Sequence, residues 1–181
     1  MSGLPVVRIP AGVVTPLYPP APGVTEVPVS AFLLMTRPAT NADFLDFVQR
    51  SPSYRRDRIA RVFAEPRYLA HWAGPLELGT AARPAQPVTN VSWFAARAFC
   101  RAAGMRLPRA AEWELAARAS HTQRDGSKDP RHRQAILEWY GKPRETLPDV
   151  PQGHANFFGV HDLHGVVWEW IEDYNDAVIT S

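Results

Sequence analysis

Apolar residues near the start of the chain follow the pattern of two short strands. Val6–Ile9 and Val27–Leu34 are rich in β-branched and large apolar residues, and the proline-rich turn Pro16–Gly23 lies between them. Consecutive apolar residues close the second segment, so both of its faces are expected to be covered. The pattern predicts two strands of a small sheet.

Two segments further along carry apolar residues at helical spacing. Asn41–Gln49 follows Thr40, whose hydroxyl is a good N-cap. Trp93–Ala103 follows Ser92 and is ended by Gly104, a residue typical of the position after a helix. The expected apolar faces consist of Phe44, Leu45, Phe47 and Val48 in the first helix and of Phe94, Ala98, Phe99 and Ala102 in the second.

A third helix is predicted over Ala110–Ala119, with a weakly capped start. Arg109 occupies the cap position and has no side-chain acceptor, so a capping box with Glu112 cannot form in the usual way. Beyond this helix, His121–Gly153 is polar and has one apolar island, Ile136–Tyr140. That stretch is predicted to be long irregular loop over a core.

Length and composition favour one domain over residues 1–181. The chain is 45% hydrophobic and 21% charged, which suffices for one core, and its 18 prolines favour short elements joined by loops. No continuous apolar run occurs in Met1–Gly12, so neither a signal peptide nor a membrane span is expected. The expected location is therefore the cytoplasm.

Charge points away from nucleic acid and membranes as partners. The 20 basic and 18 acidic residues are interspersed and leave a formal net charge of +2. Arg50–Arg61 holds five arginines and one aspartate, which is more typical of a solvated surface than of a phosphate site. A protein, peptide or small molecule is the expected kind of partner.

Cys100 is the single cysteine of the chain. No disulfide can form within one chain, and no site made of several thiolates can be built from it. A lone cysteine in a helix is more often a small buried hydrophobe than a nucleophile. Cys100 is expected to be such a residue.

Two blocks of sequence, in a fixed order, resemble the formylglycine-generating enzyme family, also called sulfatase-modifying factors. An early helix beginning at Thr40-Asn41 is also similar to that family. The resemblance covers most of the chain. The matching segments are Pro87–Trp93, Ala102–Pro108 and Ala111–Arg118 in the first block and Asn156–Gly165, Val167–Trp170 and Asp173 in the second.

The resemblance implies an α+β fold of the C-type-lectin-like type. Such a fold is loop-rich, with two or three short helices and a small mixed sheet, and here the C-terminal strands are expected to be missing because Asp176–Ser181 shows no strand or helix pattern. Large rings can fill a core that short elements do not close. Four tryptophans are therefore expected to be structural, namely Trp93, Trp113, Trp168 and Trp170.

The resemblance also implies a calcium site. In the family the matching positions bind the ion through two side chains and two backbone carbonyls, and oxygen ligands suit this hard cation. Val166 departs from the family's asparagine and should supply no ligand. The expected metal ligands are Asp162, Gly165, Val167 and Glu169.

Three histidines close to Asp162 raise the alternative of a transition-metal site. Their spacing fits no helix face, and His164 stands where histidine is ordinary for the family. Satisfied or exposed imidazoles are the favoured interpretation of His154, His161 and His164.

Two classes of function follow from the resemblance. The family's oxidases convert a peptidyl cysteine to formylglycine with oxygen and with copper held by two thiolates, which lie downstream of the tryptophan-glutamate-tryptophan motif. Cys100 lies upstream and is alone, so no catalytic residue is assigned, and copper is expected only if a segment beyond Ser181 or a second chain supplies two cysteines. The alternative is a non-catalytic lectin-like scaffold that binds a protein or peptide, as a homo-oligomer or with a complementing chain.

A third branch, the sulfoxide synthases of thiohistidine biosynthesis, ranks last because no iron-binding helical bundle fits here.

Overall fold

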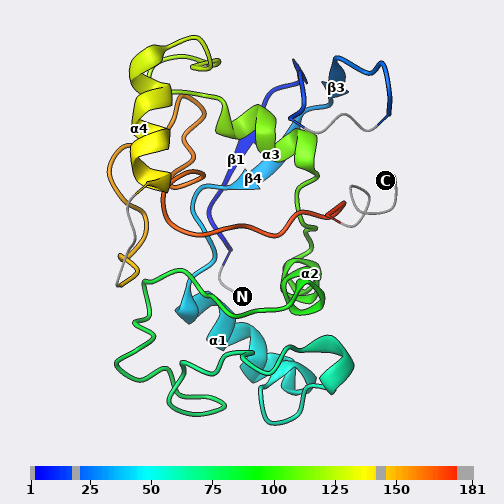
Figure 1. Cartoon of the computed structure of the whole chain (residues 1–181). Helices are drawn as coiled ribbons and strands as arrows, with labels where there is room; N and C mark the ends of the chain where they lie inside the picture. Colours follow the sequence, from blue (N-terminus) through cyan, green and yellow to red (C-terminus); the bar gives the residue numbers. More distant parts are fainter. Residues whose placement is uncertain (1–2, 18–20, 142–145, 175–181) are drawn as a thin grey trace.

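The computed structural model describes residues 3–17, 21–141 and 146–174. Most of this part of the chain is turn or loop, and short helices and strands make up the rest (Figure 1). The loop-rich α+β class is confirmed. The elements are β1 (Val6–Ile9), β2 (Gly12–Val14), β3 (Val27–Val29), β4 (Phe32–Met35), α1 (Asn41–Arg50), α2 (Trp93–Ala102), α3 (Ala110–Ala117) and α4 (Pro130–Tyr140), with 3₁₀ turns at Pro52–Tyr54 and Arg61–Phe63.

The four strands form one interrupted antiparallel hairpin. β1 pairs with β4 and β2 with β3, so that Ile9 lies opposite Phe32 and Gly12 opposite Val29. The register is the same on both sides of the gap. Pro10 lies in the gap and has no N–H to donate, which explains why the ladder breaks there.

Three expectations about the sheet are corrected. The single strand predicted over Val27–Leu34 is wrong, because the ladder break divides it into β3 and β4. β2 was not predicted, since three residues that include Gly12 are too short to show alternation. The expected mixed sheet is also wrong for the described residues, where every strand pairing is antiparallel. The expected lack of C-terminal strands concerns Asp176–Ser181, which lies outside the described residues.

The predicted caps of α1 and α2 are confirmed. Thr40 accepts the Asp43 N–H through its side chain while the Asp43 carboxylate accepts the Thr40 N–H, which makes a full capping box. Ser92 accepts the Ala95 N–H in the same way. Gly104 follows α2 with a positive φ of 72°, a conformation that a residue with a Cβ adopts with strain.

The buried face of α2 differs from the prediction at two positions, Phe94 and Ala102, which are both exposed. Phe94 is 44% exposed and packs edge-on against Phe63 at the surface. Ala95 and Phe99 are the buried residues of this helix. Ala95 therefore takes the place of Phe94 in the buried face of the helix.

α4 corrects the prediction of irregular loop over His121–Gly153. Asp129 caps the helix by accepting the Arg131 N–H, and Pro130 occupies the first turn, where a missing N–H costs nothing. None of its residues is fully buried. Because its side chains are mostly polar, hydrophobic spacing did not reveal it, although the Asp-Pro start signal was present.

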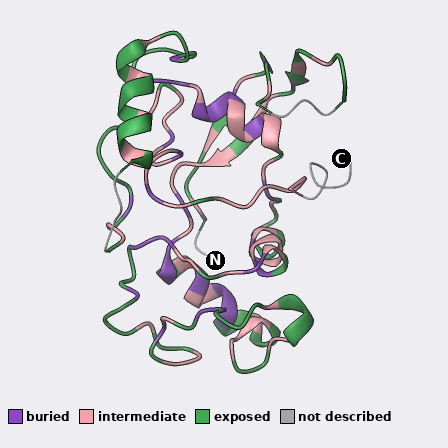
Figure 2. Cartoon of the chain, viewed as in Figure 1, coloured by how far each residue is buried: buried purple, intermediate pink, exposed green. Residues whose placement is uncertain are grey.

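Two apolar clusters form the core. One joins α1, α2 and the loop between them and includes Phe44, Phe47, Trp72 and Phe99. The other joins the hairpin, α3 and the segment around Val160. Figure 2 shows buried residues concentrated on α1 and α3, while α4 is mostly exposed.

Buried polar groups tie the loops to the first cluster. Asn41, which is 1% exposed, accepts a hydrogen bond from Trp72 Nε1 at 3.1 Å and donates one to the Arg83 carbonyl at 3.0 Å. Paired in this way, the amide avoids the cost of a buried unsatisfied group. No helix in the described part of the chain has the length and apolar character needed to cross a membrane.

Candidate functional site

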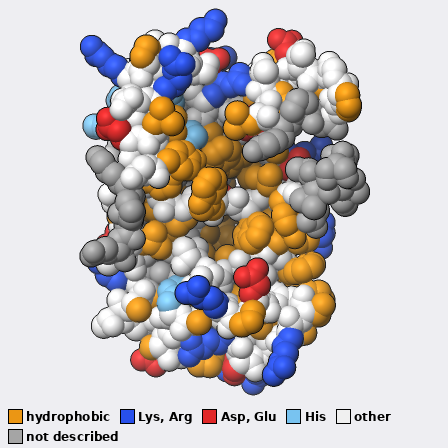
Figure 3. All heavy atoms as spheres, in the orientation of Figure 1, with side chains coloured by type: hydrophobic (Ala, Val, Ile, Leu, Met, Phe, Trp, Pro, Cys, Tyr) orange, Lys and Arg blue, Asp and Glu red, His pale blue; other side chains and the backbone are white. Residues whose placement is uncertain are grey.

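A cavity of about 420 Å³ opens between the two apolar clusters. Leu34 of β4, Phe99 of α2 and the loop residue Met105 contribute to its walls, as do Val160 and Trp170 from the segment after α4. In the space-filling view the hollow lies in the middle of the face and is surrounded by hydrophobic side chains (Figure 3). A concave apolar surface of this size is typical of a binding site.

An exposed aromatic residue borders this cavity. Trp168 lines it and is nevertheless 85% exposed. The Trp168 ring lies 5.6 Å from the ring of Tyr140, at the end of α4. The expectation that Trp168 is structural is therefore wrong, because its ring stands at the rim of the cavity instead of filling the core.

Trp93 and Trp170 are structural, as predicted. Trp93 Nε1 donates to the Ile171 carbonyl at 2.9 Å, and Trp170 Nε1 donates to the Val91 carbonyl at 2.9 Å. Both bonds fasten the segment after residue 168 to the start of α2. The cavity wall formed by this segment is consequently held by specific bonds as well as by apolar contact.

The two arginines in the lining, Arg37 and Arg106, are both paired with carboxylates. Arg37 bonds Asp43 at 2.6 Å, and Arg106 bonds Glu112 through two contacts of 2.6 Å. The Arg106 guanidinium and the Arg109 N–H together hold the pKa of Glu112 below its ordinary value, against the effect of burial. Sequence analysis missed both pairs, although arginine and carboxylate stand six positions apart in each.

Cys100 also lines the cavity, on the α2 side. Burial and the nearby charge of Glu172 raise the pKa of its thiol to about 11. A thiol with such a pKa carries almost no thiolate near neutral pH and is a poor nucleophile. This agrees with the interpretation of Cys100 as a small buried hydrophobe.

The predicted calcium ligands lie in a turn beside the cavity. Asp162 and Gly165 both have positive φ, 63° and 108°, and Val167 lines the cavity. Asp162 accepts the Gln152 N–H at 2.8 Å. An irregular turn of this kind leaves carbonyl oxygens outside regular ladders, as a calcium site requires.

Glu169 is the acidic group of this turn with the most perturbed titration. Its Oε2 accepts a hydrogen bond from Trp113 Nε1 at 2.6 Å. Burial and the charge of Asp162 raise the pKa of Glu169 to about 7, although the Trp113 bond opposes the shift. The structure therefore brings the two predicted carboxylates within electrostatic range of each other. Within the described residues, no three side chains of histidine, cysteine, aspartate or glutamate gather as a metal site.

The histidines near this turn have individual environments. His161 Nδ1 lies 3.3 Å from the Gln152 carbonyl, and the exposed His154 ring lies 4.9 Å from that of His121. The interpretation as satisfied or exposed imidazoles holds for His161 and His154. His164 is bonded at Nε2 to the Ala117 carbonyl at 2.9 Å, but its buried Nδ1 has no hydrogen-bond partner.

Residues 5–179 match the family described as the Sulfatase-modifying factor enzyme 1-like domain. The formylglycine-generating enzyme of Thermomonospora curvata is 36% identical over 123 residues, which are 60% of this chain and 41% of that protein. The inactive C-alpha-formylglycine-generating enzyme 2 of Bos taurus is 32% identical over 192 residues, 81% of this chain and 61% of that protein. The serine/threonine-protein kinase pkn1 of Chlamydia caviae is 25% identical over 83% of this chain and 24% of its own length. The chain thus spans less than two thirds of the length of each of these relatives.

Proposed function

Because the chain belongs to the sulfatase-modifying factor enzyme 1-like family, we propose that these residues form a polypeptide-binding scaffold of that family and not a self-sufficient oxidase. The single observation that carries the proposal is the apolar cavity of about 420 Å³ whose wall holds one thiol, with its pKa raised to about 11. Binding needs the concave apolar surface, whereas copper-dependent oxidation needs a pair of thiolates. The scaffold is proposed to have the lectin-like arrangement that the motifs imply.

A polypeptide suits the cavity for a chemical reason. Its walls are mainly apolar side chains, and the two arginines in them, Arg37 and Arg106, are already paired with carboxylates. Burial of an apolar side chain of a bound segment in such a space is favourable by roughly 25 cal/mol per Å² of apolar area removed from water. Trp168 at the rim offers a flat ring for further contact. A second copy of the chain or a complementing chain could present such a segment.

Calcium is the cation that the donor set fits. Burial and, to a smaller extent, the charge of Asp162 raise the pKa of Glu169, and a dication beside the two carboxylates would stabilise both in their ionised forms. The proposed ligands are the side chains of Asp162 and Glu169 and the carbonyls of Gly165 and Val167. A calcium ion bound there would supply positive charge and connect the two ends of the turn. The four ligand residues would in this way help to hold the adjoining wall of the cavity in place.

Formylglycine formation is the second candidate, favoured by the names of several relatives. Soft thiolates suit copper, but Cys100 is a single thiol, and its raised pKa keeps it protonated near neutral pH. The reaction therefore depends on two cysteines from outside these 181 residues. The relatives include proteins named as the enzyme and proteins named as its inactive form, and both kinds match about four fifths of this chain, so the proposal rests on the cavity and the single thiol.

The peptide proposal is tested with a fluorescent cysteine-bearing peptide and a matched serine peptide. We expect both to bind, with affinity reduced about tenfold or more in Met105→Glu, because a charge in the apolar wall must be desolvated. Val62→Glu is the matched control, since Val62 is 75% exposed and lies outside the cavity. Equal loss in both variants, or no binding to the wild type, would overturn the proposal.

The oxidase alternative is tested on the same peptide with Cu(I) and oxygen. Mass analysis should show an unchanged thiol after incubation with the chain alone. Conversion of the peptidyl cysteine would instead establish the enzyme and remove the scaffold as the sole function.

Calcium binding is tested by thermal melts with calcium and with chelator. We expect calcium to raise the melting temperature of the wild type, and Asp162→Asn to abolish the rise, because a bound ligand stabilises the state that holds it. An identical melt under both conditions would remove the calcium site.

A further inference from the structure

Two buried imidazole nitrogens near α4 have no hydrogen-bond partner. They are His132 Nε2 and His164 Nδ1. Buried polar atoms are rarely left unpaired in native proteins, and an exception calls for an ion, a water molecule or a functional role. The proposed peptide site and the calcium turn use neither nitrogen.

The hydrogen bond of His164 determines which of its nitrogens can bind a ligand. The Ala117 carbonyl can only accept, so His164 Nε2 carries the proton and Nδ1 keeps its lone pair. Metal-binding histidines in proteins are oriented in this way, with the second nitrogen donating to a carbonyl or carboxylate. The Trp113 ring packs against the imidazole in a T-shaped contact, with 5.5 Å between the ring centroids, and further limits its rotation.

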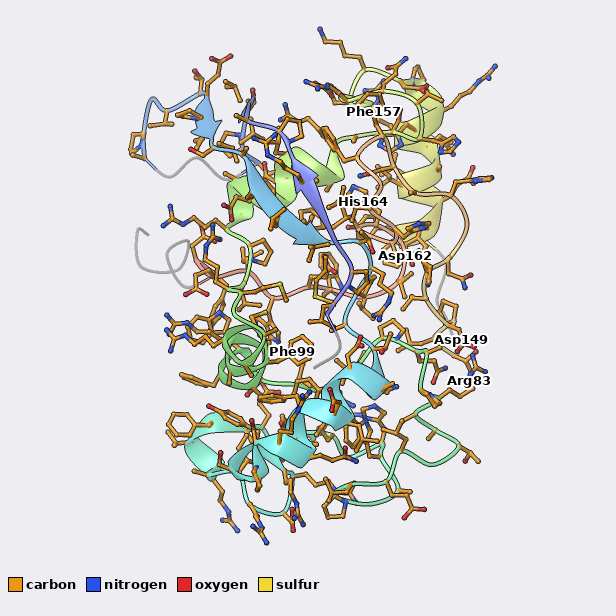
Figure 4. The ribbon with its side chains drawn as sticks, turned by 180° about the vertical axis from the view of Figure 1, so that it is seen from behind. Arg83, Phe99, Asp149, Phe157, Asp162 and His164 are labelled. Carbon is orange, nitrogen blue, oxygen red and sulfur yellow. The ribbon has the colours of Figure 1, made fainter. Side chains whose placement is uncertain are left out.

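Packing brings His132 to the same turn of backbone. A Cβ added to Gly126 would lie 2.7 Å from His132 Cδ2, so the ring rests directly on that glycine. Gly126 in turn donates to the Arg118 carbonyl at 2.8 Å, one residue from the carbonyl that His164 binds. Both imidazoles therefore lie against the stretch that runs from the end of α3 to Gly126, and His164 lies between α3 and α4 (Figure 4).

A second contact keeps α4 beside His164. A Cβ added to Gly165 would lie 3.5 Å from the Trp139 ring, so Trp139 packs on the residue that follows His164. His132 and Trp139 stand seven positions apart, two turns of helix, and share one face of α4. The placement of His132 near His164 therefore rests on packing at both ends of the helix.

We propose that His132 Nε2 and His164 Nδ1 form a two-imidazole site for a divalent transition-metal ion of the zinc class. Neutral imidazole nitrogens are ligands for such ions, while calcium prefers oxygen. Because no third histidine, cysteine, aspartate or glutamate joins them in the described residues, water completes the coordination and binding is weaker than at a structural zinc site. The ion clamps α4 against the turn that contains His164.

The clamp acts on the rim of the cavity. α4 carries Tyr140, which contacts Trp168 at that rim. None of the residues of α4 is fully buried, so few apolar contacts hold the helix in place. Zinc binding is expected to slow amide hydrogen exchange in α4 without altering exchange in α1.

The test is a calorimetric titration of the metal-free full chain with zinc chloride in saturating calcium. We expect one zinc per wild-type chain, and an affinity about tenfold or more lower in His132→Gln and in His164→Gln. His121→Gln is the matched control, because His121 is exposed and bonded to the Ala155 carbonyl, and it should bind zinc as the wild type does. Absence of stoichiometric zinc binding, which a bridging water would explain, overturns the proposal, as does equal loss in the control.

Two further measurements show whether a loss of zinc binding comes from misfolding and whether the zinc site is independent of the proposed calcium site. His132→Gln lies on an exposed helix, and its unchanged circular dichroism would show that lost zinc binding is not misfolding. Asp162→Asn, which removes a proposed calcium ligand, should retain zinc binding. Failure of the calcium or peptide proposals therefore leaves the zinc result intact, and the reverse also holds.

Discussion

At the scale of single residues, the most informative group is Glu112, which combines burial with three hydrogen bonds. Its carboxylate accepts two bonds from Arg106 and one from the Arg109 N–H. These bonds stabilise the ionised form and hold its pKa below the ordinary value of 4.5. The same contacts join the start of α3 to the wall of the cavity.

Glu112→Gln tests this at low pH. Since the pKa of Glu112 in the folded state lies below 4.5, the unfolded chain takes up a proton at this group first as the pH falls. The contribution of Glu112 to stability is therefore fully present above pH 4.5 and is lost as the pH falls through the folded-state pKa. We expect the variant to lose about 1–2 kcal/mol at pH 7 and to show a flatter decline below pH 4.5. Urea unfolding across pH measures both, with Glu65→Gln at an exposed position as control. A decline as steep as that of the wild type would show that Glu112 is not the titrating group.

At the scale of elements, helix starts are capped by two different routes. Thr40 and Asp43 cap α1 from within four residues of sequence. The start of α3 was expected to be soft because Arg109 cannot cap it, but Asp173 accepts the Ala110 N–H at 2.8 Å from 63 residues away. Local sequence could predict the first arrangement and could not predict the second.

Arg109→Ser is expected to strengthen this end of α3. Arg109 already has the extended backbone of a cap residue, and a serine hydroxyl there can accept the Glu112 N–H and complete the capping box. We expect a gain of about 0.5–1 kcal/mol over Arg109→Ala, the matched variant that also removes the guanidinium. Thermal melts of the two variants make the comparison. Equal stabilities would mean that Asp173 and Glu112 already satisfy the helix start.

At the scale of the whole molecule, two apolar clusters flank one cavity, and Phe99 belongs both to the first cluster and to the cavity wall. Its ring stacks on Phe44 at 5.7 Å, meets Phe47 edge-on at 5.8 Å and also lines the cavity. Stability and the shape of the proposed binding surface therefore depend on the same side chain. α1 and α2 are held together largely by this aromatic cluster.

Phe99→Ala is expected to destabilise the fold strongly and to enlarge the cavity. Truncating a buried phenylalanine in a packed cluster costs about 3–5 kcal/mol. Leu33→Ala is the control on the same cavity, since Leu33 is 64% exposed, and should change stability by less than about 0.5 kcal/mol. Urea unfolding measures both variants. Similar losses would contradict the view that the aromatic cluster, and not the cavity rim, carries the stability.

The limits of sequence reading follow from the range of the interactions. Thr40, Ser92 and Gly104 act within one turn of helix, so the positions of α1 and α2 were predictable. The positions of the Trp168 and His132 side chains were not predictable, because exposure and burial depend on what packs nearby. Trp168 lies exposed at the cavity rim, whereas the Nε2 atom of His132 is buried although its helix is largely exposed.

By itself, the sequence determined the family, the loop-rich α+β class, the main helices and the supply of a single thiol, because motifs, caps and composition are properties of the chain alone. Only the tertiary structure decided where the apolar cavity opens, that Asp173 caps α3, and that Glu169 and Asp162 lie within electrostatic range. Each of these needs groups distant in sequence or held apart by an irregular turn, and the packing of hairpin, helices and loops brings them together.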